Sequence, residues 1–161
     1  MITELPLQRT LTDAQAQLLT APDVACSGGF PLWLAGGANF YSDVDLYPLS
    51  WNAYYRALHL LGEHGDFLGS SPHAVKYMYT ADTWQLMHPA QIDALELMAT
   101  ADLSPCATAL VWDDARFRIF TLYPEDIAQR VCRVLIRHDW TDYRIQTYLK
   151  KGYTVHEDPH V

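Results

Sequence analysis

The order of hydrophobic and polar residues predicts a chain that mixes helices and strands. Apolar residues at three- to four-residue intervals predict helices at about residues 12–20, 30–35, 51–61, 91–99, 124–137 and 141–151. Short apolar runs and alternating patterns predict strands at about residues 24–26, 41–47, 74–80, 83–87, 106–112 and 116–122. The expected fold class is therefore α+β, with a small mixed β-sheet flanked by helices.

Local signals place several boundaries of these elements. Thr12-Asp-Ala-Gln15 is a capping box, and Ser50 is suited to cap the next long helix. Gly36-Gly37 is expected to end a helix, and residues 62–72 read as a loop rich in Gly and Ser. The helix at 51–61 carries an aromatic and leucine stripe, which we expect to face the core rather than a cofactor: Trp51, Tyr54, Tyr55, Leu58 and Leu61.

Length and composition predict one domain with a sizeable core. The chain has 161 residues, half of them hydrophobic, and we expect one domain over residues 1–155 with a flexible tail over residues 156–161. Its start has no signal-peptide pattern and no stretch is long enough to span a membrane, so we expect a cytoplasmic protein without membrane contact. Three widely spaced cysteines fit a reducing compartment and indicate neither a disulfide framework nor a zinc site.

Charge is distributed unevenly along the chain. The net charge of −8 argues against a general nucleic-acid binder. Residues 1–114 carry 13 acidic and 3 basic side chains, whereas residues 115–161 carry 6 acidic and 8 basic ones. The basic part is either a set of solvated helix faces or a positive wall for a nucleoside triphosphate or an RNA end.

The stretch from Ser27 to Asp45 carries the candidate chemistry. Asp43 and Asp45 alternate with Val44 and Leu46, which places both carboxylates on one face of a strand. Two ionised carboxylates at this distance repel each other unless a cation lies between them, and hard oxygen ligands suit Mg²⁺. The turn Ser27-Gly28-Gly29 leads into an apolar helix, and its backbone N–H groups can approach a phosphate. The sequence thus predicts a phosphate site that faces a metal-binding carboxylate pair.

These motifs resemble those of the nucleotidyltransferase superfamily, which includes polymerase β and the CCA-adding and poly(A)-adding enzymes. Gly28-Gly29 is followed by 13 residues and then by Asp43-Val44-Asp45-Leu46, like the glycine and Asp-apolar-Asp motifs of that family. Residues 83–87 are similar to its following antiparallel strand, and residues 101–106 to a later segment of CCA-adding enzymes. Residues 144–153 resemble an Arg-Ile-x-Lys-Tyr-x-x-Arg-Gly-Phe ending, so the resemblance covers about residues 24–155.

The resemblance implies a magnesium-dependent nucleotidyltransferase. Asp43 and Asp45 would bind Mg²⁺ (or Mn²⁺), and Ser27, Gly28 and Gly29 would contact the phosphates of a nucleoside triphosphate. A nucleoside monophosphate would pass to a hydroxyl acceptor with release of pyrophosphate. The acceptor would be an RNA (tRNA) end or a protein hydroxyl.

The sequence departs from this family at the third carboxylate. Active members carry an acid on the strand at residues 83–87, where this chain has Gln85, an amide that cannot act as a base. Asp82 and Asp102 are the candidate substitutes, and Asp102 is preferred as the third catalytic residue. The alternative function is a catalytically inactive member of the fold that binds a nucleotide or a protein partner. A third alternative is an unrelated α+β interaction module.

Overall fold

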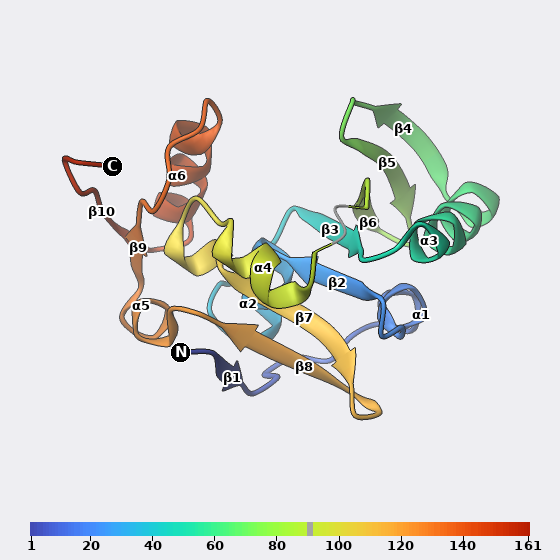
Figure 1. Ribbon diagram of the computed structural model, residues 1–161, viewed down its shortest axis with the longest axis horizontal. Coiled ribbons are helices and arrows are strands. Elements are labelled where there is room, and N and C mark those ends of the chain that lie inside the picture. Colours follow the sequence, from blue (N-terminus) through green and yellow to red (C-terminus); the bar gives the residue numbers. More distant parts are fainter. Residues whose placement is uncertain (90–91) are drawn as a thin grey trace.

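The computed structural model describes residues 1–89 and 92–161 (Figure 1). Its strands are β1 (Thr3–Leu5), β2 (Val24–Ser27), β3 (Asp43–Pro48), β4 (Asp66–Ser70), β5 (Ala74–Tyr79), β6 (Asp82–Met87), β7 (Thr108–Asp113), β8 (Arg116–Thr121), β9 (Val131–Arg133) and β10 (Thr154–His156). Its helices are α1 (Asp13–Leu19), α2 (Gly29–Leu34), α3 (Trp51–His64), α4 (Ala94–Ala99), α5 (Pro124–Gln129) and α6 (Thr141–Lys150), with a 3₁₀ turn at Ser104–Cys106. The predicted α+β class is confirmed.

The main sheet is mixed, as predicted, and larger than the small sheet expected from the sequence. Eight strands lie in the order β1-β8-β7-β2-β3-β6-β5-β4, and β9 and β10 form a separate parallel pair. Strand β6 runs parallel to β3 and antiparallel to β5. The expected antiparallel strand at residues 83–87 is therefore antiparallel to only one of its neighbours.

Alternation along β3 gives the sheet two different faces at its centre. Val44 and Leu46 are fully buried in the main core, where Phe30 and Leu34 of α2 and Leu61 of α3 also lie. Helices α2 and α4 contact β2 and β7 from opposite sides (Figure 1). Asp45, which alternates with Val44 and Leu46, points to the opposite face of the sheet, on the side of α4. Side chains fill this side less completely than the main core.

Most predicted caps and turns are confirmed. Thr12 and Gln15 form the capping box of α1, and the Ser50 hydroxyl accepts a hydrogen bond from the Ala53 N–H at the start of α3. Gly36 has a φ of +77° and ends α2 as expected. Thr141 lies within α6, whose N-cap is Trp140. The expected strands at 74–80 and 83–87, and those at 106–112 and 116–122, pair as two hairpins, with positive φ angles at Thr80 and Ala81 in one turn and at Asp114 and Ala115 in the other.

The predicted helix at 124–137 was wrong beyond Gln129. Arg130 has a left-handed backbone with a φ of +57°, and the next residues form β9. Strand β9 pairs with β10, more than twenty residues further along the chain. Because β10 includes His156, the expected flexible tail overlaps this strand by one residue. The apolar residues at 131–135 fit a helix by spacing alone, and a long-range pairing overrides that preference.

The region after α3 also differs from the prediction. Residues 62–72 were expected to form a loop, but α3 continues to His64 and β4 forms the sheet edge against β5. The aromatic stripe is only partly in the core: Tyr54 and Leu61 are buried, whereas Trp51 and Tyr55 are 49% and 58% exposed. The helix expected at 91–99 is described from Ala94 onward, and Gln91 lies outside the described residues.

Candidate nucleotide and metal site

The glycine turn and the carboxylate pair lie against each other. Strand β2 pairs with β3 so that Ser27 is opposite Asp45. The chain then turns at Gly28, whose φ of +91° favours glycine, and enters α2. A Cβ atom at Gly28 would lie 3.8 Å from Asp45 Oδ2, so the turn faces this carboxylate without filling the space before it. Ser27 is buried and donates its hydroxyl to the Thr108 carbonyl at 3.0 Å.

Asp43 and Asp45 occupy the same face of β3 but have different surroundings. Asp43 is half-exposed and accepts a hydrogen bond from Lys76 Nζ at 3.3 Å. Asp45 Oδ1 is buried and has no hydrogen-bond partner among the described residues. Burial, together with the negative charge of Asp43, raises the pKa of Asp45 to about 6. The fold therefore buries a carboxylate oxygen without a hydrogen-bond partner among the described residues.

This donor set fits a divalent cation. Two carboxylates on alternate residues of a rigid strand supply hard oxygen ligands, and the unpartnered oxygen of Asp45 is available for coordination. Within residues 1–89 and 92–161, no group of three or more His, Cys, Asp or Glu side chains is placed to hold a metal. A cation at this site would therefore depend on the Asp43 and Asp45 pair, with its remaining ligands from water or a bound phosphate.

Gln85 occupies the position next to Asp45. The parallel pairing of β3 and β6 sets Asp45 beside Gln85, and the pairing of β5 and β6 sets Lys76 on the other side of Gln85. The position at which the resemblance led us to expect an acid is thus occupied by an amide, with Asp45 on the strand to one side and Lys76 on the strand to the other. Asp82 does not supply the missing acid, because its buried carboxylate accepts hydrogen bonds from Tyr41 at 2.7 Å and Gln15 at 2.9 Å.

Asp102 lies at the same cavity, but its carboxylate is already bound. It is 1% exposed, accepts a hydrogen bond from Arg144 Nη1 at 2.6 Å, and accepts another from the Thr141 hydroxyl at 3.1 Å. Arg144 also reaches the Cys106 sulfur with its other terminal nitrogen at 2.8 Å. This geometry suits Asp102 for orienting Arg144. Among the described residues, Asp102 does not form a metal-holding group with Asp43 and Asp45.

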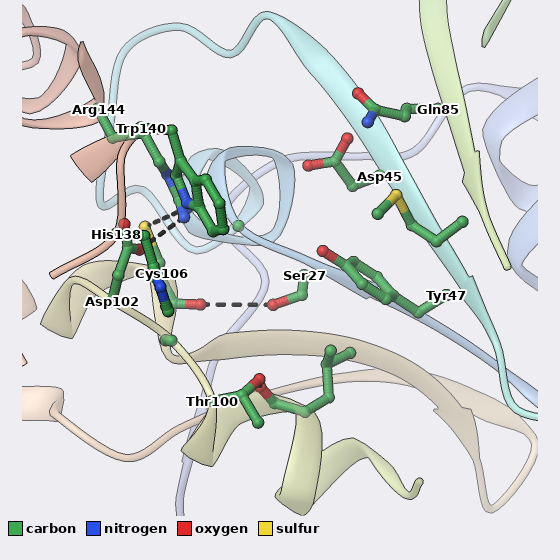
Figure 2. Close-up of a pocket in the computed structure, with 14 residues that line it drawn as sticks. Ser27, Asp45, Tyr47, Gln85, Thr100, Asp102, Cys106, His138, Trp140 and Arg144 are labelled. Atoms are coloured by element: carbon green, nitrogen blue, oxygen red, sulfur yellow. Dashed lines mark hydrogen bonds and ion pairs between the residues drawn. The ribbon is translucent and has the colours of Figure 1, made fainter. Parts of the chain in front are cut away.

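Two adjoining cavities surround these groups. The larger, of about 350 Å³, lies between α4, the start of α6 and the acidic face of β3. Figure 2 shows His138, Trp140 and Arg144 on one side of it and Asp45, Tyr47 and Gln85 on the other. The smaller, of about 150 Å³, lies between the glycine turn, the Asp43–Asp45 face of β3 and one side of α6 from Tyr143 to Lys151. Gly28, Asp45, Gln85 and Arg144 line both, so the two cavities form one cleft.

Lys151 lies in the segment 144–153 that resembles a family ending, but it was not predicted to be a site residue. Its side chain is buried, and its Nζ would lie 2.9 Å from a Cβ atom at Gly29. No ion pair joins it to a carboxylate within the part of the chain that the structure describes. Burial lowers its pKa. The excess of basic residues after residue 115 was the available signal, but only folding brings this lysine against the glycine turn.

Known proteins resemble this chain in structure, whereas comparisons of its sequence find no match. No protein-family model matches the chain, and no curated protein matches it. Among solved structures, it is similar to a CCA-adding enzyme in apo form I, with 15% identity and a TM-score of 0.58. It is also similar to the Thermotoga maritima CCA-adding enzyme complexed with tRNA (17%, TM-score 0.59) and to a CCA-adding enzyme with ATP (16%, TM-score 0.58).

The extent of these matches limits them to the fold. They cover 85%, 85% and 83% of this chain but only 36%, 36% and 35% of the respective solved chains, so the chain spans about a third of their length.

Within residues 1–89 and 92–161, none of the helices has the length and apolar character needed to cross a bilayer. The shared architecture and the mixed sheet together show that this chain has a nucleotidyltransferase-like fold.

Proposed function

We propose that this chain binds a nucleoside triphosphate with a divalent cation and transfers the nucleoside monophosphate to a hydroxyl acceptor. The observation that carries the proposal is the meeting of the Gly28 turn with Asp45, whose buried Oδ1 has no partner in the described residues. A phosphate with its cation would supply that partner. The structural similarity to CCA-adding enzymes, one of them solved with ATP, supports the same assignment.

Each side of the cleft would have a separate task. Asp43 and Asp45 would hold Mg²⁺ or Mn²⁺, which when bound would neutralise charge on the phosphates. The backbone N–H of Gly29 and the Lys151 ammonium would bind the phosphate oxygens, whereas the Gly28 N–H already donates to the Thr108 carbonyl at 3.3 Å and Gly28 would contribute by keeping the space before Asp45 open. Arg144, held by Asp102 at 2.6 Å, would stabilise negative charge at the junction of the two cavities. We therefore give Asp102 a positioning role rather than that of a third metal ligand.

The reaction requires one bond to form and one to break. The acceptor oxygen would bond to the α-phosphorus while the bond from that phosphorus to the bridging oxygen breaks, and pyrophosphate would leave. The hydroxyl proton of the acceptor needs a base. Since Gln85 is an amide and Asp102 is bound to Arg144, Asp43 and Asp45 are the described carboxylates of the cleft that could accept it, directly or through water. An RNA end remains the first acceptor to examine, and a protein hydroxyl the second.

One observation favours a second function, that of a nucleotide-binding protein without transferase activity. Gln85 is aligned with Asp45 at the position where an acid is usual in the family, and no cluster of three carboxylate, His or Cys side chains forms among the described residues. A site with two carboxylates can still bind a nucleotide with its cation. It would lack the additional ligand and base that transfer requires.

Transfer of label separates the two functions. The full chain would be incubated with Mg²⁺, each nucleoside triphosphate labelled at the α-phosphate, and total RNA or a protein extract as acceptor. We expect label in an acceptor and matching pyrophosphate release, both reduced at least a hundredfold in Asp43→Asn and Asp45→Asn. Asp114→Asn, at an exposed hairpin turn, is the matched carboxylate control. Nucleotide binding without transfer would establish the second function, and absence of nucleotide binding would refute both.

A further inference from the structure

Trp140 and His138 form an aromatic pair at the mouth of the larger cavity. Their rings are stacked, with centroids 4.5 Å apart and planes 19° from parallel. Trp140 is 55% exposed, although it lines the cavity together with His138 (Figure 2). One face of a large indole is thus left open beside a cleft, at a cost in exposed apolar surface.

The pair is fixed in place by hydrogen bonds. The backbone N–H of His138 donates a hydrogen bond to the Thr141 hydroxyl at 2.9 Å, and that hydroxyl donates to the Asp102 carboxylate at 3.1 Å. The backbone carbonyl of Asp102 also accepts a hydrogen bond from the Leu135 N–H at 2.7 Å. Asp102 therefore ties down the segment that precedes α6 from two directions. An aromatic surface held in this way can bind a planar ligand at a low entropic cost.

The polarity of the cleft sets the direction of a bound nucleotide. The smaller cavity is lined by the glycine turn, Lys151 and the Asp43 and Asp45 carboxylates, which suit phosphates and a cation. The larger cavity extends from these groups to the aromatic pair and is also lined by Leu97 and Met87. If the triphosphate lies at the narrow end, as the proposed function requires, the nucleoside extends toward Trp140.

We infer that the His138–Trp140 pair is the nucleobase subsite and that it holds the base by stacking. Two polar side chains that line this cavity are already hydrogen-bonded within the protein. The Thr100 hydroxyl donates to the Leu97 carbonyl at 2.8 Å, and Asp102 is bound to Arg144 and Thr141. Since every base has a stacking face, such a subsite accepts all four bases and favours the larger purines.

The test compares a nucleotide with its phosphate part alone. Binding of α,β-methylene-ATP, the corresponding CTP analogue and inorganic tripolyphosphate would be measured by calorimetry in Mg²⁺, since the methylene bridge prevents transfer. Trp140→Leu should weaken binding of the ATP analogue about tenfold and that of the CTP analogue less, without changing binding of tripolyphosphate. Trp140→Phe, which keeps an aromatic ring, should recover most of the affinity.

Trp51 provides a matched control. It is similarly exposed and stacks on Tyr55 with centroids 5.9 Å apart, but it lies on α3 and does not line either cavity. Trp51→Leu should leave all three affinities unchanged and keep the fluorescence quenching that the ATP analogue causes, whereas Trp140→Leu should lose it. Equal affinity of wild type and Trp140→Leu for the ATP analogue would overturn the inference while leaving the proposed function intact. If neither the analogues nor tripolyphosphate bind the wild type, the proposed function fails and the inference with it.

Discussion

Asp45 is the residue at which the requirements of the site oppose those of folding. Its buried carboxylate has an oxygen without a partner in the described structure, and its pKa is raised from the ordinary value of 3.8 to about 6 by burial and by Asp43. A carboxyl whose pKa is higher in the folded state binds its proton more tightly there than in the unfolded chain. Its contribution to stability is therefore lost as pH rises from about 4 to about 6, and its charge destabilises the metal-free fold above that range.

Replacing this carboxyl by an amide should stabilise the metal-free protein at neutral pH. We expect Asp45→Asn to raise the free energy of unfolding by roughly 3 kcal/mol at pH 7.5, since the raised pKa corresponds to an energy of that order. At pH 4.5 the gain should be much smaller. Urea unfolding with EDTA present at both pH values measures it, and Asp114→Asn serves as an exposed control. An equal gain at the two pH values would contradict the assignment of the effect to the Asp45 charge.

Lys151 presents the complementary case of a buried positive charge. Its ammonium lies 4.9 Å from the Tyr148 ring centroid and beside the Gly29 backbone, and burial lowers its pKa. We expect Lys151→Met to leave folding stability unchanged or up to about 1 kcal/mol higher, because methionine fills a similar volume without the cost of burying a charge.

The same substitution should weaken phosphate binding. Affinity for inorganic tripolyphosphate in Mg²⁺ should fall about tenfold or more, because a charge-assisted contact is lost. Lys150→Met is the matched control, since that neighbouring lysine is exposed and lines neither part of the cleft. Loss of affinity in Lys150→Met equal to that in Lys151→Met would assign the effect to net charge instead.

The residues that the sequence identified are those with a local signature. Gly28, Asp43 and Asp45 are recognisable because a glycine turn and alternation along a strand act over a few positions, and the structure brings them together. Lys151 falls within the segment 144–153 that resembles a family ending, but its role in the site was not predicted, and Trp140 has no local signature. Each acquires its place only when α6 packs across the glycine turn, which depends on contacts more than a hundred residues apart, such as that of Tyr153 with the Gly37 carbonyl.

Elements with strong local signals were predicted well, and those that depend on distant pairing were not. Helices α1 and α3 begin where their capping residues indicate. Strands β9 and β10 are three residues each and exist only by pairing with each other, so neither periodicity nor propensity reveals them. Strand β4 was not predicted for a similar reason. Its glycine and its exposed residues are typical of a loop, and the strand forms only by pairing with β5.

Close packing at the end of α2 offers a test at the scale of the element. Gly37 follows α2, and a Cβ atom there would overlap the Leu32 side chain and lie 3.1 Å from Ile127 Cγ2. Since Leu32 is fully buried and cannot move outward, we expect Gly37→Ala to lower the free energy of unfolding by about 1–3 kcal/mol. Denaturant unfolding followed by circular dichroism measures the change.

Gly62 provides the control of opposite sign. It lies within α3, and a Cβ atom there would meet only the Tyr77 hydroxyl, at 3.8 Å. Alanine should therefore raise stability by about 0.5–1 kcal/mol through its better helix propensity. An unchanged or higher free energy of unfolding in Gly37→Ala would show that the end of α2 is not under this packing constraint.

At the scale of the whole molecule, the cleft lies between two hydrophobic clusters. The main cluster joins α1, α2 and α3 to the large sheet. The second, which includes Leu103, Ile145 and Tyr148, joins α6 and the β9–β10 pair to the end of α2. Asp45 and Gly28 belong to the large sheet and its turn, whereas Lys151, Arg144 and Trp140 belong to α6 or its ends. A nucleotide in the cleft would therefore contact both parts at once.

Such a ligand should stabilise α6 more than the distant edge of the sheet. Figure 1 shows α6 and β4 at opposite ends of the molecule. We expect saturation with Mg²⁺ and α,β-methylene-ATP to slow amide exchange in Thr141–Lys150 about tenfold or more, because local opening of α6 would have to break the new contacts. Exchange in Asp66–Ser70 should change much less. Lys151→Met should remove most of the protection, and equal slowing at both ends would indicate only global stabilisation, against a ligand that bridges the two clusters.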